Sequence, residues 1–205
     1  MIEDFAQPAW VEAQERFAAV VSAGLASLAR RLRRRAKAMS SHATVAIAPE
    51  PATGAAAQYC LGEYYRELGA RFDGGFDPGL SLFPSPDEFA PPRGVFLVAW
   101  RQGEPVGCGG IKPISVDAAY LKRMWVAPEA RGLGLARRLL GALEERARIL
   151  GYSVVRLETN KALVEAQRLY RSSGYCETPP FNDEPYAHHW FEKTLRGKGG
   201  RPRRD

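Results

Sequence analysis

The chain has 205 residues, 45% of them hydrophobic, 25% charged, and a formal net charge of +6, which suits one main core of a globular protein. Three cysteines without CxxC spacing argue against a disulfide scaffold and a zinc site, so we expect a reducing, cytoplasmic setting and no metal. An acidic N-terminus and the lack of any run of about 18 apolar residues argue against a signal peptide and a membrane span.

The first predicted element is a long amphipathic helix over residues 8–38, followed by a linker at 39–43. Its apolar positions recur at three- and four-residue steps, and six basic residues crowd into 30–37. Such a charge run is either a solvated helix end beside the C-terminal dipole or a contact for DNA or another polyanion. We favour the solvated end, because no second helix-turn-helix element follows. A dimerisation arm is the remaining alternative.

From residue 44 the pattern alternates between strands and helices. Two strands flank a tight turn at 102–104 and a third strand follows them, which predicts an antiparallel meander. A Gly/Pro/Asp-rich loop precedes the meander and has the length of a functional loop. We expect strands at 44–50, within 94–114 on both sides of that turn, and at 119–128, 153–159, 174–178 and 187–195; helices at 55–72, 133–150 and 161–172; and the long loop, with one helical turn, at 73–93.

The end of the chain, residues 196–205, is rich in Gly, Pro and Arg and has no apolar side chain to bury, so we expect a disordered basic tail. Together with the preceding patterns this divides the chain into an N-terminal helix and linker at 1–43, a folded domain at 44–195 and the tail. Since the basic residues concentrate at the two ends, the domain itself is mildly acidic.

The stretch RGLGLARRLL at 131–140 places a glycine-rich turn at the start of a helix, directly after a strand. Such a turn gathers unpaired N–H groups and the positive end of a helix dipole, which together bind anions. The sequence lacks the Walker pattern, and the turn lacks the context of a dinucleotide-binding fold. Taken alone, the two glycines are equally compatible with close packing of a helix on a sheet.

The context of the turn decides between these alternatives. Arg131-Gly132-Leu133-Gly134-Leu135-Ala136 matches R/Q-x-x-G-x-G/A, follows MWVAPEAR, and is itself followed by LGYSVVRLETN and EAQRLYRSSGYCE. These motifs resemble the GNAT superfamily of acyl-CoA N-acetyltransferases, closely over 94–178 and more loosely over 44–195. The resemblance implies an α/β (α+β) fold whose mixed, mostly antiparallel central sheet is splayed between its fourth and fifth strands and flanked by helices. The N-terminal helix is an addition to this fold.

The resemblance also implies that acetyl-CoA lies in the opening between the two strands and serves as cosubstrate. Its pantetheine arm would pair with backbone groups of Met124, Trp125 and Val126, and its pyrophosphate would sit on the amides of 131–136. Gly134 and Ala136 would be small because a larger side chain would hold the phosphate away from the N–H groups. The implied cofactor-binding residues are Met124, Trp125, Val126, Arg131, Gly132, Leu133, Gly134, Leu135, Ala136 and Asn160.

For the chemistry, Tyr170 stands where the family has its general-acid tyrosine and would protonate the departing thiolate. Many members of the family carry a glutamate early in the fourth strand. In this sequence that position falls near Tyr120, which is a poor base at neutral pH. Glu158 is the candidate base, with an ion-paired carboxylate or a water chain as alternatives. Leu163 stands where many relatives have asparagine, and Asn160 is the candidate to replace it. A backbone amide near Trp125 or Val126 would polarise the thioester carbonyl.

We therefore expect an N-acetyltransferase that acts by direct attack of a primary amine, with a small-molecule amine as partner. The loop with Asp183 and Glu184 precedes the last strand and could attract a cationic amine. The alternatives are a protein or peptide N-acetyltransferase, and a non-catalytic acyl-CoA sensor with a DNA-binding or dimerising N-terminal arm. Homodimerisation and nucleic-acid binding would both depend on that arm.

Overall fold

A computed structural model of the protein describes residues 45–81 and 85–195. The predicted N-terminal helix, the linker and the basic tail lie outside these residues. The interpretations that depend on them, a dimerisation arm and a nucleic-acid contact, therefore stay predictions.

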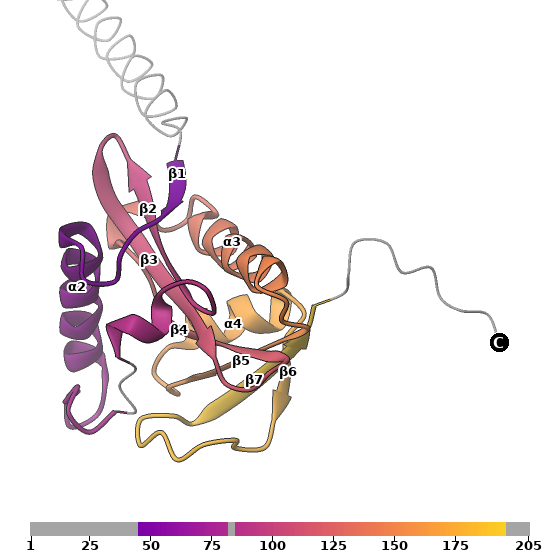
Figure 1. Ribbon diagram of the computed structural model, residues 1–205. Helices are drawn as coiled ribbons and strands as arrows, with labels where there is room; N and C mark the ends of the chain where they lie inside the picture. Colours follow the sequence, from indigo (N-terminus) through magenta and orange to yellow (C-terminus); the bar gives the residue numbers. More distant parts are fainter. Residues whose placement is uncertain (1–44, 82–84, 196–205) are drawn as a thin grey trace, which may run out of the picture. The chain divides into compact units, whose positions relative to one another are not determined.

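The elements follow one another in the predicted order, and α2 is followed by the long loop with its single short helix, as expected (Figure 1). That helix, η1, carries a capping box in which Glu88 accepts a hydrogen bond from the Ser85 N–H at 2.9 Å. The elements are β1 (Val45–Pro49), α2 (Ala55–Arg71), η1 (Pro86–Phe89), β2 (Val95–Arg101), β3 (Glu104–Pro113), β4 (Ala118–Val126), η2 (Pro128–Ala130), α3 (Leu135–Ile149), β5 (Val154–Thr159), α4 (Val164–Ser172), β6 (Cys176–Thr178) and β7 (His189–Thr194).

Within the described residues the strands form one seven-stranded sheet in the order β1-β2-β3-β4-β5-β7-β6. Every neighbouring pair is antiparallel except β4 and β5, which run parallel. This confirms the predicted mixed, mostly antiparallel sheet, including the meander formed by β2, β3 and β4.

The parallel pair is short. Only Ala118–Tyr120 of β4 pair with Val154–Arg156 of β5, whereas β4 continues to Val126 and β5 to Thr159. The two strands therefore separate after three residue pairs, which confirms the predicted splay. The remaining edge of β4 faces an opening in the sheet.

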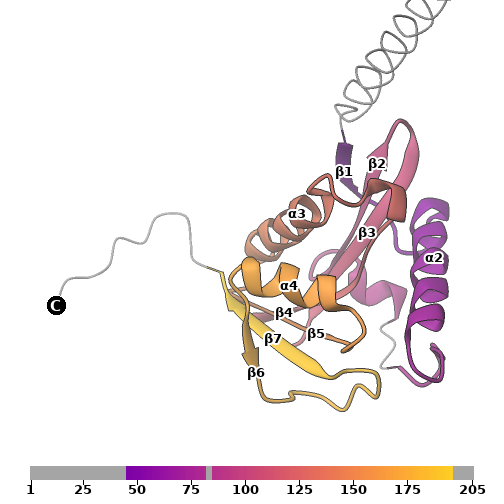
Figure 2. The same cartoon turned by 180° about the vertical axis from the view of Figure 1, so that it is seen from behind.

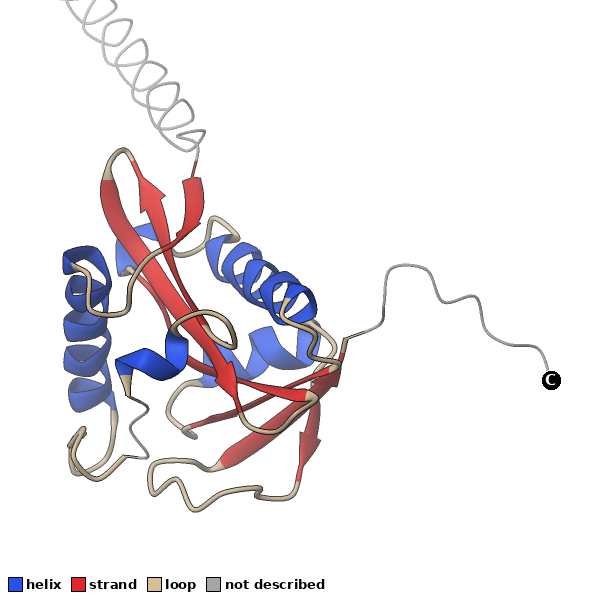
Figure 3. Cartoon of the chain, viewed as in Figure 1, coloured by secondary structure: helices blue, strands red, loops and turns tan. Residues whose placement is uncertain are grey.

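Helix α2 lies on one side of the sheet, and α3 and α4 lie on the other (Figures 1, 2 and 3). Helix α3 presents an apolar stripe to the sheet, with Leu139, Leu140 and Leu143 fully buried. Because most of the sheet is covered on both sides, β2 carries a nearly continuous buried run rather than an alternating one.

Two helices begin later than the sequence predicts. Helix α3 begins at Leu135 instead of residue 133, because Gly132 and Gly134 both have φ of 74° and belong to a left-handed turn. Helix α4 begins at Val164 instead of residue 161, because Asn160 Oδ1 accepts a hydrogen bond from the Ala162 N–H at 2.9 Å and forms a local turn. In both cases a turn occupies residues that a hydrophobic pattern assigns to the helix.

Candidate active site

The glycine turn joins the end of β4 to α3 through η2. A Cβ atom added at Gly132 or Gly134 would meet nothing within 4 Å, so crowding does not explain the glycines. Their left-handed backbone does, since it is costly for residues with a side chain. The turn opens directly onto the first N–H groups of α3, which have no partner within the helix.

A long cleft of about 540 Å³ runs from this turn along the end of β4. Its walls come from β4, the turn, α2 and α4, so elements on both sides of the sheet opening contribute. Of the residues predicted from the sequence, those lining it are Met124, Trp125, Val126, Arg131, Gly132, Gly134, Leu135, Ala136 and Tyr170. Leu133 is 48% exposed and lies outside the lining.

Glu67 of α2 links several residues of the cleft wall through hydrogen bonds. Its Oε2 accepts a hydrogen bond from Trp125 Nε1 at 2.9 Å and one from Arg131, and its Oε1 accepts one from Arg71 at 3.1 Å. Arg71 in turn pairs with Glu165 of α4. Burial opposes ionisation of Glu67, but the hydrogen bonds from Arg131, Trp125 and Arg71 outweigh it and lower the pKa of Glu67. This network joins α2 to the glycine turn and to α4.

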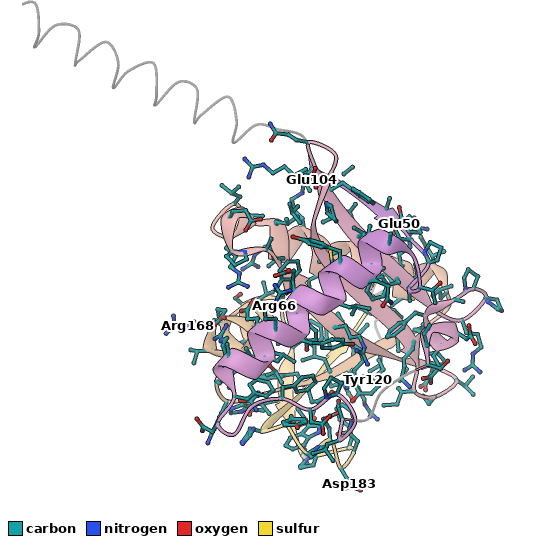
Figure 4. All side chains as sticks on the ribbon, turned by 90° about the vertical axis from the view of Figure 1, so that its left-hand side faces the viewer. Glu50, Arg66, Glu104, Tyr120, Arg168 and Asp183 are labelled. Atoms are coloured by element: carbon teal, nitrogen blue, oxygen red, sulfur yellow. The ribbon has the colours of Figure 1, made fainter. Side chains whose placement is uncertain are left out.

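Arg131 also donates from Nε to the Val126 carbonyl at 2.9 Å. Its guanidinium is thus committed to holding the turn against the end of β4. Any anion held at the turn would therefore rely on backbone N–H groups and on other cations, such as Arg168. That side chain lines the cleft, is exposed, and projects from the edge of the molecule (Figure 4).

A second cavity, of about 90 Å³, lies beside the cleft. The two share residues of α2, β4 and α4, so they meet at the sheet opening. The shared lining residues are Tyr64, Leu68, Met124, Leu163, Ala166 and Tyr170. The smaller cavity is also lined by Phe76 and Ser81, so the loop after α2 forms part of its wall.

A β-bulge in β4 shapes this second cavity. Cys108 pairs with Trp125 and Gly110 with Lys122, so Gly109 alone faces both Arg123 and Met124. Arg123 has φ of 61°, an uncommon backbone conformation for a residue with a side chain. As a result Lys122, Arg123 and Met124 all line the cavity, although strict alternation would turn Arg123 to the opposite face.

Buried charges occupy the floor of the second cavity. Lys122 Nζ forms an ion pair with Glu158 and lies 3.4 Å from Glu184 Oε2, which also accepts a hydrogen bond from Ser81 at 3.0 Å. The side chains of Lys122, Glu158 and Glu184 are 10%, 7% and 5% exposed. Glu158 Oε2 is buried and has no hydrogen-bond partner among the described residues. Charged side chains are rarely buried to this extent, because an unpaired buried charge is energetically costly.

Tyr170 stands at the junction of the two cavities. Its ring packs against Tyr175 and Phe191, at centroid distances of 5.8 and 5.9 Å. Burial, followed by the nearby charge of Glu158, raises the pKa of Tyr170, so the phenol keeps its proton at neutral pH. A buried phenol of this kind can donate a proton or a hydrogen bond to a group in the junction.

The sequence pattern of the acetyltransferase (GNAT) family matches residues 62–175, which is more than half of the chain. The chain belongs to this family.

Individual GNAT relatives resemble parts of the chain. An IAA acetyltransferase of Azospirillum brasilense is 44% identical over 94 residues, 45% of this chain and 60% of the relative. An N-acetyltransferase of Schizosaccharomyces pombe, described as uncharacterized, is 36% identical over 100 residues, 48% of this chain and 61% of the relative. The chain thus spans about three fifths of each. Among solved structures, an acyl-CoA N-acyltransferase from Klebsiella pneumoniae is 28% identical, with a TM-score of 0.60 over 76% of this chain and 100% of that one.

In this GNAT chain the two residues predicted for catalysis lie at one site. Tyr170 and Glu158 both line the second cavity. Glu158 is ion-paired with Lys122, as one of the alternatives for it predicts, and its role as a base stays a prediction. Asn160 lines the second cavity rather than the long cleft, and its amide donates to the Tyr186 carbonyl at 2.8 Å. Its role in cofactor binding stays a prediction.

Tyr120, near which the resemblance places the family's usual glutamate, does not line either cavity. Burial, reinforced by Glu158, raises its pKa, so it cannot serve as a base at neutral pH. Of the two predicted acids in the loop before β7, Glu184 is buried in the second cavity and Asp183 is exposed at the outer edge of the molecule (Figure 4).

Sequence reasoning missed several site residues: Glu67, Lys122, Arg123 and Arg168. In the sequence, Glu67 is indistinguishable from any exposed acidic residue of a helix. Its role becomes visible only in the fold, where Trp125 and Arg131 donate hydrogen bonds to it. The cavity position of Arg123 depends on the β-bulge, and no local sequence pattern predicts that bulge. The pair Lys122-Arg123 did carry a signal, because two consecutive cations are unusual inside a strand that is otherwise apolar.

Among residues 45–81 and 85–195, no group of three or more His, Cys, Asp or Glu side chains is arranged to hold a metal ion. Within the same residues no helix combines the length and apolar character that crossing a membrane requires.

Replacing Glu67 by Gln should destabilise the protein in a pH-dependent way. At pH 7 we expect the free energy of unfolding to fall by about 2 kcal/mol, because charge-assisted hydrogen bonds are lost. Since the folded pKa of Glu67 is lowered, its stabilisation is complete above the unfolded pKa and is lost as pH falls through the folded pKa. The difference between wild type and Glu67→Gln, measured by urea denaturation, should therefore shrink in acid.

Glu63→Gln is the matched control, because Glu63 lies on the same helix and pairs with the exposed Arg66. Its effect should stay within about 0.5 kcal/mol. A difference for Glu67→Gln that is as large in acid as at pH 7 would contradict the assignment.

Proposed function

We propose that this chain is an N-acetyltransferase that moves an acetyl group from acetyl-CoA to a primary amine of a small molecule. The observation that carries the proposal is the meeting of two different cavities at Tyr170. One ends at an anion-binding turn and suits a long phosphorylated donor. The other is small and holds buried carboxylates, which suit an amine. Membership of the acetyltransferase (GNAT) family supports the same reaction class.

Acetyl-CoA would occupy the long cleft. Its pyrophosphate would accept hydrogen bonds from the N–H groups at the start of α3, where the helix dipole also favours an anion. Its pantetheine arm would run along the edge of β4 that β5 leaves unpaired, where backbone groups at 124–126 can pair as they would with a neighbouring strand. The thioester would then reach the junction beside Met124 and Tyr170.

In the reaction, the neutral amine attacks the thioester carbonyl, a C–N bond forms and the C–S bond breaks. The amine's proton would pass to Glu158, whose Oε2 has no other partner among the described residues, directly or through water. Tyr170 would give its proton to the departing thiolate. A backbone N–H near Trp125 or Val126 would stabilise the negative charge that develops on the carbonyl oxygen.

Direct attack is favoured over a covalent enzyme intermediate. Cys108, the cysteine of the central strands, lines neither cavity. It is fully buried, and burial raises the pKa of its thiol well above its ordinary value. A nucleophilic cysteine needs the opposite, an accessible thiolate. The small volume of the second cavity likewise favours a small acceptor over a folded protein.

The test is a thiol-release assay with acetyl-CoA and a panel of primary amines. We expect at least one small amine to release free CoA above the hydrolysis background, with the acetylated amine confirmed by mass spectrometry. Binding of acetyl-CoA without release for any amine would overturn the enzymatic proposal and favour an acyl-CoA sensor.

Tyr170→Phe should lower kcat by about 100-fold or more, because the thiolate loses its proton donor. The KM for acetyl-CoA should change little. Tyr175→Phe is the matched control, since Tyr175 is a buried tyrosine that packs on Tyr170 but lines neither cavity. Equal turnover by wild type and Tyr170→Phe would remove Tyr170 from the mechanism and leave the proposed reaction in place.

Arg168→Gln should raise the KM for acetyl-CoA about fivefold and leave kcat unchanged, because a cation at the rim of the cleft favours phosphate groups by about 1 kcal/mol. The increase should be smaller at high salt, which screens exposed charges. Arg146→Gln is the control: Arg146 is also exposed but lines neither cavity. Identical KM values for the two variants would show that Arg168 does not contact the donor.

A further inference from the structure

The charges around the second cavity alternate in sign. Arg123 and Glu184 carry opposite charges and line the same cavity, Glu184 lies 3.4 Å from Lys122 Nζ, and Lys122 pairs with Glu158. Lys122 is therefore shared between two carboxylates and is neutralised within the protein. The row has a guanidinium at one end and, at the other, a carboxylate oxygen, Glu158 Oε2, that has no partner among the described residues.

Arg123 reaches this position through its unusual backbone. A left-handed backbone is strained for a residue with a side chain, and such strain concentrates at functional sites. The bulge turns a guanidinium toward the cavity, where it lies 5.3 Å from the centre of the Tyr65 ring. Burial lowers the pKa of Arg123 to about 10, which still leaves it charged at neutral pH.

We propose that the acceptor is a free amino acid, whose ammonium group is received by Glu158 and whose carboxylate is received by Arg123. This inference rests on the proposed function and specifies its substrate class. A zwitterion carries one charge of each sign, so its binding leaves the net charge of the buried row unchanged. Its ammonium group would lie beside the Glu158 carboxylate and its carboxylate beside the Arg123 guanidinium. A guanidinium is also the side chain best matched to a carboxylate, since its N–H groups can form two parallel hydrogen bonds.

Other amines fit this charge pattern less well. A diamine would bring a second positive charge beside Lys122 and Arg123 in a poorly solvated site. An amino-acid amide, or the N-terminus of a peptide, has an amine but no carboxylate beside it, and would bring no carboxylate for the Arg123 guanidinium to bind. Substrate recognition would thus depend on a charge next to the reacting amine.

The outer wall of the cavity indicates where the side chain of the amino acid lies. Phe76 packs against Tyr65 and Tyr186, with ring centroids 5.8 and 4.8 Å apart, and Phe72 contacts both Phe76 and Tyr186. The Asp77 N–H donates to the Tyr186 hydroxyl at 2.9 Å and joins the two loops that carry these rings. An aromatic wall favours apolar side chains over charged ones.

The experiment compares matched pairs of amino acid and amino-acid amide, such as alanine with alaninamide and phenylalanine with phenylalaninamide, in the thiol-release assay. Concentrations are set so that the unprotonated amine is equal within each pair, because the amide has the more acidic ammonium group. We expect kcat/KM to be at least about tenfold higher for the acid than for its amide, the effect of a charge-assisted bidentate contact. This comparison uses the wild-type protein and needs no variant.

Arg123→Gln should then bring the ratio of acid to amide close to one, mainly by raising the KM for the amino acid, and should leave the KM for acetyl-CoA unchanged. Arg123→Lys keeps the charge but loses the paired N–H groups, so it should restore part of the preference. Arg156→Gln is the control: Arg156 lies on β5, pairs with Glu192 at 2.6 Å and lines neither cavity. It should keep the wild-type ratio.

Amides or dipeptides accepted as well as the free acids by the wild type would overturn the amino-acid proposal while the acetyltransferase proposal stands. So would an unchanged ratio in Arg123→Gln. Absence of thiol release with acids and amides alike, together with a negative result across the wider amine panel, would instead overturn the proposed function and this inference with it.

Discussion

The early end of the β4–β5 pairing is the constraint on which the site depends. Three parallel pairs hold the two strands together, and beyond Tyr120 they separate. A continuous sheet would satisfy the backbone of β4 along its whole length and would leave no opening. Because the strands separate, the edge of β4, the start of α3 and the inner side of α4 line a common cleft. The network around Glu67 then secures α2 as its remaining wall.

The bulge in β4 adds to the splay a second departure from regular sheet geometry. It brings Arg123 into the lining of the same cavity as Lys122 and Met124, and the loop before β7 adds Glu184 to that lining. Charges that would otherwise be costly to bury are arranged with alternating sign. The splay thus forms the donor side of the proposed reaction and the bulge forms the acceptor side, with Tyr170 between the two.

Much of the fold followed from local pattern. The strands and helices of 45–195 were predicted in the right order, and the glycine turn with its downstream LYRSSGY motif was specific enough to identify the family and the splayed sheet. The errors concern boundaries at 133 and 161, where the hydrophobic period continues across a turn. Gly132 and Gly134 allow a helix but do not require one, and Asn160 forms its turn through a hydrogen bond that periodicity does not register.

By itself the sequence determined the family, the order of elements, and the turn and tyrosine proposed to handle the acetyl donor, because these depend on short motifs whose residues are neighbours in the chain. Only the tertiary structure decided which charges face one another. Lys122, Glu158 and Glu184 come from a strand, a second strand and a loop, and their meeting depends on sheet order and on a bulge. The sequence offered Glu158 and Glu184 as separate candidates, but the proposed acceptor site combines them with Lys122 and Arg123, and that combination could not be predicted from local pattern.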